Sequence, residues 1–140
     1  FTIITDFKTN QSHPSASLII NEDYPTSGGF WQLRLDSGII SFYLYNNNVQ
    51  PHNEVIYQND ICNDNQWHQV VVNRYSIDGR VVIYIDGVLV KESYQGTGTF
   101  QNGNSIKMGY GVIAGRESFL AGRIEKSLYG SASSPTTGII

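Results

Sequence analysis

The sequence has little charge and no run of basic residues. Of its 140 residues 15% are charged, well below the roughly 25% of an average soluble domain. With 9 basic and 12 acidic residues and no cluster of lysine or arginine, the chain has no electrostatic footprint for nucleic acid or for an anionic membrane surface. The longest uncharged stretch, residues 37–53, turns polar at Asn46, so the sequence predicts no membrane span.

Cysteine and clustered histidine are also missing. Cys62 is the only cysteine, which excludes an internal disulfide and a zinc site built from cysteines. His13, His52 and His68 show neither His-x-His nor His-x₃-His spacing, so we expect no transition-metal site. The chain begins with Phe1 and shows no signal peptide, which indicates a processed product or an excised piece.

Neutral polar and β-forming residues take the place of charge. Asn, Gln, Ser and Thr together account for 42 residues, and Ile and Val for 26, against only 12 Ala, Leu and Met. Branched and aromatic side chains suit a pleated sheet, whereas Ala and Leu suit helices. The composition therefore favours one β-rich domain, which at this length can bury a core without disulfides.

Period-two alternation recurs between turn signals and predicts about ten strands. Asp78-Gly79 and Asp86-Gly87 lie between apolar alternations and predict hairpins, and the segment 36–38 predicts a tight hairpin. The predicted strands are residues 1–8, 16–21, 30–35, 39–45, 54–58, 67–75, 80–85, 88–94, 105–110 and 118–126. This pattern is typical of an all-β, two-sheet antiparallel sandwich.

The alternation also predicts which side of each strand faces the core. The expected core residues are Trp31, Leu33, Leu35, Ile40, Phe42, Leu44, Val70, Val72, Val81, Ile83 and Ile85. The opposite sides carry amides, an arginine and tyrosines. If these strands are neighbours in one sheet, its outer face is polar and aromatic.

Four stretches of the sequence resemble a known family. A Trp-His pair opens a strand in residues 65–70, and a Tyr-hydrophobic-Asp-Gly turn follows in residues 83–90. Together they are similar to the most recognisable motif of laminin-G-like domains. Residues 30–38 are similar to the middle hairpin of the family, and residues 119–125 to its closing strand. Over residues 1–130 the chain thus resembles a laminin-G-like domain of the concanavalin A-like lectin/glucanase superfamily, and residues 131–140 form a tail.

This resemblance implies a jelly-roll fold and an extracellular or cell-surface setting. It also implies that Trp67 fills the core and that Asp86-Gly87 makes a turn. The strand that usually precedes Phe1 is missing, and residues 127–140 show no clear terminal strand. An unpaired edge or the C-terminal tail would then allow self-association, which keeps open an alternative role as a subunit of a viral particle, fibre or filament.

Catalytic motifs are not found in the sequence. Glycoside hydrolysis needs two carboxylates about 5–10 Å apart, and hydrolases of this superfamily carry theirs on one strand as Glu-x-Asp-x-x-Glu. No two of the twelve acids are separated by two positions, so we expect no hydrolase of that type. There is no Gly-x-Ser-x-Gly elbow, and we expect Cys62 to be a small buried hydrophobe.

Two binding sites are predicted. Glu22 and Asp23 offer adjacent carboxylates for Ca²⁺, which prefers oxygen ligands, and the alternative is a solvated loop. The other site is a carbohydrate-binding surface that combines hydrogen-bonding side chains with aromatic rings for stacking on sugars. The alternative interpretation of these residues is an ordinary exposed sheet face. Its residues are Gln32, Arg34, Tyr43, Tyr45, Asn73 and Tyr84. The sequence therefore predicts a non-catalytic recognition module for a glycan or an extracellular protein.

Overall fold

A computed structural model of the chain describes residues 1–12, 16–21, 30–45, 54–96, 106–113 and 116–130. These residues form twelve strands, and none lies in a helix that could cross a membrane. The strands are β1 (Thr2–Thr9), β2 (Ala16–Asn21), β3 (Phe30–Asp36), β4 (Ile39–Tyr45), β5 (Glu54–Ile61), β6 (Trp67–Arg74), β7 (Arg80–Ile85), β8 (Val88–Tyr94), β9 (Ile106–Met108), β10 (Tyr110–Ile113), β11 (Arg116–Phe119) and β12 (Gly122–Gly130).

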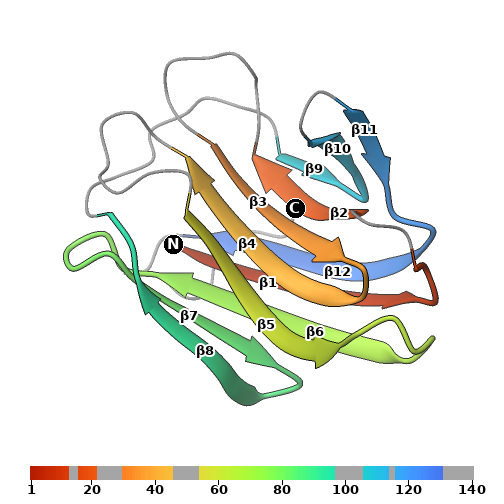
Figure 1. The fold of residues 1–140 in the computed structure, drawn as a ribbon, viewed down its shortest axis with the longest axis horizontal. Coiled ribbons are helices and arrows are strands. Elements are labelled where there is room, and N and C mark those ends of the chain that lie inside the picture. Colours follow the sequence, from red (N-terminus) through yellow and green to blue (C-terminus); the bar gives the residue numbers. More distant parts are fainter. Residues whose placement is uncertain (13–15, 22–29, 46–53, 97–105, 114–115, 131–140) are drawn as a thin grey trace.

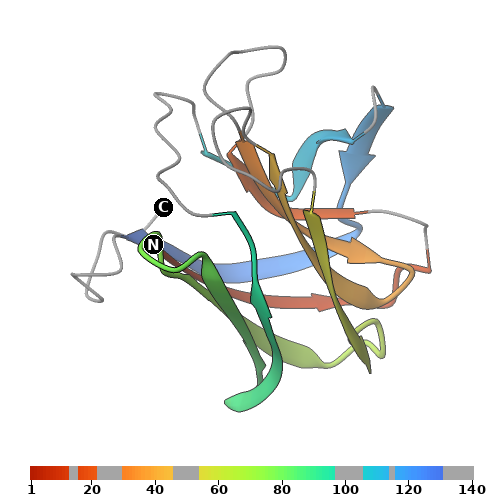
Figure 2. The ribbon, with the colours of Figure 1, turned by 60° about the vertical axis from the view of Figure 1, so that its left-hand side comes forward.

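Two antiparallel sheets of five strands form the sandwich (Figures 1 and 2). One sheet, called the β1 sheet, has the order β12-β1-β6-β7-β8, and the other, called the β3 sheet, has the order β5-β4-β3-β2-β9. A separate hairpin of β10 and β11 lies beside β2 and β9 (Figure 1). The predicted all-β sandwich is confirmed.

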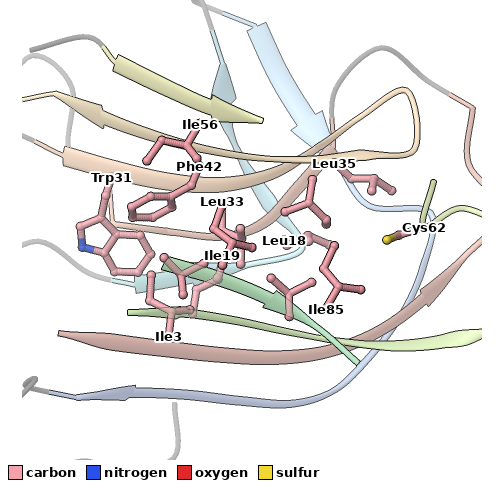
Figure 3. Packing of buried hydrophobic residues seen from close by; sticks show 14 of the residues in the cluster. Ile3, Leu18, Ile19, Trp31, Leu33, Leu35, Phe42, Ile56, Cys62 and Ile85 are labelled. Carbon is pink, nitrogen blue, oxygen red and sulfur yellow. The ribbon is translucent and has the colours of Figure 1, made fainter. Parts of the chain in front are cut away.

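The core lies between the two sheets. All eleven residues that the alternation assigns to the core are buried, and the most exposed of them, Ile85, is only 6% exposed. Trp31 stacks on Phe1, with 5.7 Å between the ring centroids, and meets Phe42 at 6.4 Å. Figure 3 shows Trp31 and Phe42 at one end of this core and Cys62 at the other. Cys62 is 1% exposed, as expected for a small buried hydrophobe.

The three predicted hairpins are present. Ser37 and Gly38 have φ of 53° and 87°, and Asp86 and Gly87 have φ of 50° and 82°. Two consecutive residues with positive φ are the signature of the type I′ turn, whose twist matches that of the flanking strands. Gly79, in the turn between β6 and β7, has a φ of 73°.

The C-terminal part of the fold differs from the prediction. The single strand predicted over residues 118–126 is wrong, because β11 ends at Phe119 and β12 begins at Gly122. β12 then runs to Gly130, which pairs with Thr2, so the segment 127–130 does form a strand. The sequence of this segment alternates only weakly and so does not predict a strand. It becomes a strand because it pairs with β1. The tail over residues 131–140 lies outside the described residues.

Candidate functional site

Three of the predicted carbohydrate-binding residues form one cluster on the outer face of the β3 sheet. Gln32 of β3 pairs with Tyr43 of β4, and the guanidinium carbon of Arg34 lies 5.3 Å from the centroid of the Tyr43 ring. Arg34 also approaches Asp36 at 3.6 Å, and Ser41 donates a hydrogen bond to the same carboxylate. These contacts confirm that β3 and β4 place the predicted residues on neighbouring positions.

This cluster has little contact with solvent. Gln32 is 3% exposed, Ser41 is fully buried, and the side chain of Arg34 is 12% exposed. The guanidinium covers one side of the Tyr43 ring, so that side is closed to a sugar. Tyr45 ends β4 opposite Phe30, and its side chain lies outside the described residues.

The other two predicted residues lie in the other sheet. Asn73 belongs to β6 and Tyr84 to β7, both in the β1 sheet. The outer faces of the two sheets point away from each other, so the prediction of one six-residue surface is wrong. Alternation shows which side of a strand faces outward but not which sheet contains the strand. Asn73 accepts a hydrogen bond from Thr2 at 2.8 Å, and Tyr84 is half-buried.

Trp67 is the largest departure from the sequence-based expectation. It was expected in the core, but it is 43% exposed. Val70 and Val72 of the same strand point inward, so the odd-numbered Trp67 points outward. His68 takes the inward position instead and lies 6.0 Å from the ring of Phe7. Trp67 lies directly opposite Lys8 of β1.

A surface pocket of about 340 Å³ lies at this end of the β1 sheet. We call it the Lys8 pocket. It is lined by Lys8, Thr9, Asn10, Asn65, Ala121, Gly122 and Arg123. Lys8 pairs with Arg123 on one side and with Trp67 on the other, so the three residues form a row across β12, β1 and β6.

Hydrogen bonds from backbone and side-chain groups hold three chain segments together around the pocket. The N–H of Asn65 donates to the carbonyl of Thr9 at 2.9 Å, and the hydroxyl of Thr9 donates to the carbonyl of Ala121 at 2.6 Å. The N–H of Ala121 donates to the side chain of Gln11 at 2.7 Å. At Gly122 a Cβ would lie 2.2 Å from the carbonyl oxygen of Lys8, so only glycine allows this close approach of β12. These contacts fix the backbone segments that form the walls of the pocket.

His68 fixes the loop that carries Asn65 and leads into Trp67 at the start of β6. Its Nδ1 lies 2.8 Å from Asp86 and its Nε2 lies 2.9 Å from Asp64. Partial burial lowers the pKa of His68, but the hydrogen bonds and charges of Asp86 and Asp64 outweigh it, so the pKa lies above the ordinary 6.5. The hydrogen bond from His68 in turn lowers the pKa of Asp64. We call Asp64, His68 and Asp86 the histidine clamp.

The histidine clamp does not have the arrangement of a glycosidase. Its two carboxylates bind opposite nitrogens of one imidazole, so the ring fills the space that a glycosidic bond would need. Burial and the surrounding acids raise the pKa of Cys62 to about 12, which keeps the thiol neutral and unsuited to nucleophilic attack. In the described part of the chain, no group of three or more His, Cys, Asp or Glu could hold a metal ion. Glu22 and Asp23 lie outside that part, so the calcium site stays a prediction.

The outward position of Trp67 could be predicted from the sequence, but the pocket could not. Counting back by twos from Val71 along β6 places Trp67 outward, although the family motif suggested the core. Lys8 also falls on the outward phase of β1. The pairing of β1 with β12 joins residues more than a hundred positions apart, and no local pattern predicts it.

Comparison with known proteins supports the fold. A family model described as the concanavalin A-like lectin/glucanases superfamily matches residues 1–136. The CBM40 of Ruminococcus gnavus IT-sialidase, solved with α2,3-sialyllactose, is similar with a TM-score of 0.70 and 13% identity, over 90% of this chain and 72% of that one. Domains LG4-5 of the mouse laminin α1 chain give a TM-score of 0.70 and 13% identity, over 91% of this chain and 34% of that one.

Curated relatives match a shorter stretch of the chain. The thiazole synthase of Pelagibacter ubique is 55% identical over an alignment of 62 residues that covers 39% of this chain and 21% of that protein. The chain therefore spans about a fifth of the length of this relative. A match over so small a part of both proteins assigns no activity to this chain.

Proposed function

The chain belongs to the concanavalin A-like lectin/glucanase superfamily, and we propose that it is a non-catalytic domain that binds carbohydrate. The superfamily includes both lectins and hydrolases, so the choice between them rests on the site. In the histidine clamp the imidazole of His68 occupies the space between the two carboxylates, which leaves no room for a substrate there. The pocket found in the described part of the chain has no carboxylate in its lining. Binding without hydrolysis fits this arrangement.

The observation that carries the proposal is the exposed indole of Trp67 beside the Lys8 pocket. An aromatic ring stacks on the apolar face of a sugar, while amides donate and accept hydrogen bonds with its hydroxyls. Trp67 of β6 lies directly opposite Lys8 of the neighbouring strand β1, and the amides of Asn10 and Asn65 line the adjoining pocket. The site therefore offers the two chemistries that a sugar requires, on a surface open to solvent.

The similar CBM40 binds sialyllactose, which supports carbohydrate as the ligand class. The same likeness and the laminin domains support an extracellular or cell-surface setting as part of the proposal. The β3-sheet cluster of Gln32, Arg34 and Tyr43 is the second candidate surface. Its low exposure makes it the weaker of the two.

A glycan array with three matched variants tests the proposal. Trp67→Ala should lower the affinity for the bound glycan at least tenfold, since it removes the stacking surface. Tyr94→Ala removes an aromatic side chain that is 63% exposed on β8, at the far edge of the same sheet, and should leave binding unchanged. Tyr43→Ala tests the β3-sheet cluster.

Three results would contradict the proposal. Binding lost in Tyr43→Ala but kept in Trp67→Ala would move the site to the β3 sheet. Turnover of a polysaccharide would show an enzyme. A concentration-dependent polymer without glycan binding, seen by light scattering, would favour the alternative role as an assembly subunit.

A further inference from the structure

The Lys8 pocket carries two cations at directly opposite positions. Lys8 of β1 and Arg123 of β12 are register partners, and both point outward because Phe7 and Ile124 face the core. Like charges at directly opposite positions of an antiparallel pair destabilise it. In the described part of the chain, neither cation has an ion-pair partner.

Two acidic residues of the described part of this region accept hydrogen bonds from other groups. Asp6 lies two positions along β1 and accepts a hydrogen bond from the amide of Gln69 at 2.9 Å. Asp64 precedes Asn65 and binds His68 and the N–H of Gln66. Neither of these carboxylates forms an ion pair with Lys8 or Arg123.

The row of Arg123, Lys8 and Trp67 also has the size of a saccharide. Adjacent strands lie about 4.8 Å apart, so three strands place Trp67 about 10 Å from Arg123. A guanidinium binds a carboxylate or sulfate through two parallel hydrogen bonds, and an ammonium adds a point charge. An anionic group at one end and a sugar ring at the other would match the chemistry of the row.

We propose, on the basis of the carbohydrate-binding function above, that the Lys8 pocket selects an acidic saccharide. The carboxylate or sulfate of the ligand lies between Lys8 and Arg123, the sugar ring stacks on Trp67, and the amides of Asn10 and Asn65 bind the hydroxyls. The anion relieves the repulsion between the two cations, which a neutral sugar does not. Binding is therefore expected to weaken as salt increases.

The test compares each acidic glycan with its neutral counterpart. Lactose, α2,3-sialyllactose and lactose 3′-sulfate form one such series, and an array of neutral, carboxylated and sulfated glycans extends it. The acidic form should bind at least tenfold more tightly, a difference of about 1.4 kcal/mol, as measured by titration calorimetry. Lys8→Gln and Arg123→Gln should each remove this advantage, and Lys91→Gln, at an exposed position on β8, should not.

Arg123→Lys keeps the charge but loses the planar fork, so it should retain only part of the preference. Thermal unfolding checks that each variant is folded. The carboxylated and sulfated members of the series identify which anion fits better, and a preference for either supports the proposal.

The possible failures are distinguishable. If neutral and acidic forms bind equally well through Trp67, acidic selectivity is overturned while carbohydrate binding stands. If acidic glycans are preferred but folded Lys8→Gln and Arg123→Gln bind like the wild type, the site is overturned. If no glycan binds at all, the proposed function fails and the selectivity fails with it.

Discussion

Two glycines in neighbouring hairpins should respond very differently to the same substitution. Gly79 and Gly87 both have positive φ, at 73° and 82°, and an alanine there pays about 1–2 kcal/mol for the left-handed conformation. At Gly87 an added Cβ has no heavy atom within 4 Å. At Gly79 it would lie 1.8 Å from the carbonyl oxygen of Gln95, far below an ordinary contact of 3.4–4 Å.

The backbone must move to accept alanine at position 79. The N–H of Gln95 donates to the carbonyl of Gly79 at 2.8 Å, so a shift of the two segments apart also weakens this hydrogen bond. Overpacking costs about 1–3 kcal/mol, and a weakened hydrogen bond about 1 kcal/mol more. We therefore expect Gly87→Ala to lower the free energy of unfolding by about 1–2 kcal/mol and Gly79→Ala by about 3–6 kcal/mol.

Urea unfolding followed by tryptophan fluorescence measures both values. Trp31 is buried and Trp67 is exposed, so the change in emission reports mainly on Trp31. A domain stability of about 10 kcal/mol, the middle of the usual range, leaves both variants folded in water, and an unchanged slope against urea would show that the unfolded state is unaffected. Equal losses in the two variants, or a larger loss in Gly87→Ala, would refute the steric reasoning.

Three further predictions concern the core, the histidine clamp and the thiol. Trp31→Ala should cost about 3–5 kcal/mol in urea unfolding, because the indole is buried against the β3-sheet core; a loss below 1 kcal/mol would contradict this packing. Because the pKa of His68 is raised in the folded protein, His68 stabilises the fold fully below pH 6.5, and this stabilisation is lost as pH rises through its folded-state pKa. Because the pKa of Asp64 is lowered, Asp64 stabilises the fold fully above pH 3.8, and this stabilisation is lost as pH falls through its folded-state pKa. Stability from the clamp should therefore be greatest between these limits, and a proton-NMR titration of His68 with a midpoint below 6.5 would refute it. Cys62, with a pKa of about 12, should not react with Ellman's reagent at pH 8 until the protein unfolds, and rapid reaction of the native protein would show that the thiol is accessible.

The sequence could predict the layers of the fold but not the arrangement of strands within them. Alternation along β3, β4, β6 and β7 identified the buried side of each strand, because a residue's side of the strand is a local property with a period of two. The assignment of Asn73 and Tyr84 to the same surface as Arg34 failed, because sheet membership depends on long-range pairing. The pocket depends on it too, since Lys8 and Arg123 meet only through the pairing of β1 and β12.

The Trp67–His68 pair connects the structural role of the motif with the proposed binding site. Successive residues of a strand point to opposite sides, so a pair at the start of β6 cannot put both rings in the core. His68 is the inward member, and its bonds to Asp64 and Asp86 tie the loop before β6 to the turn after β7. Trp67 is then displayed on a fixed backbone, beside Lys8. A rigid aromatic surface costs less conformational entropy on binding than a mobile one, so the histidine that organises this corner also favours the recognition that we propose for the tryptophan.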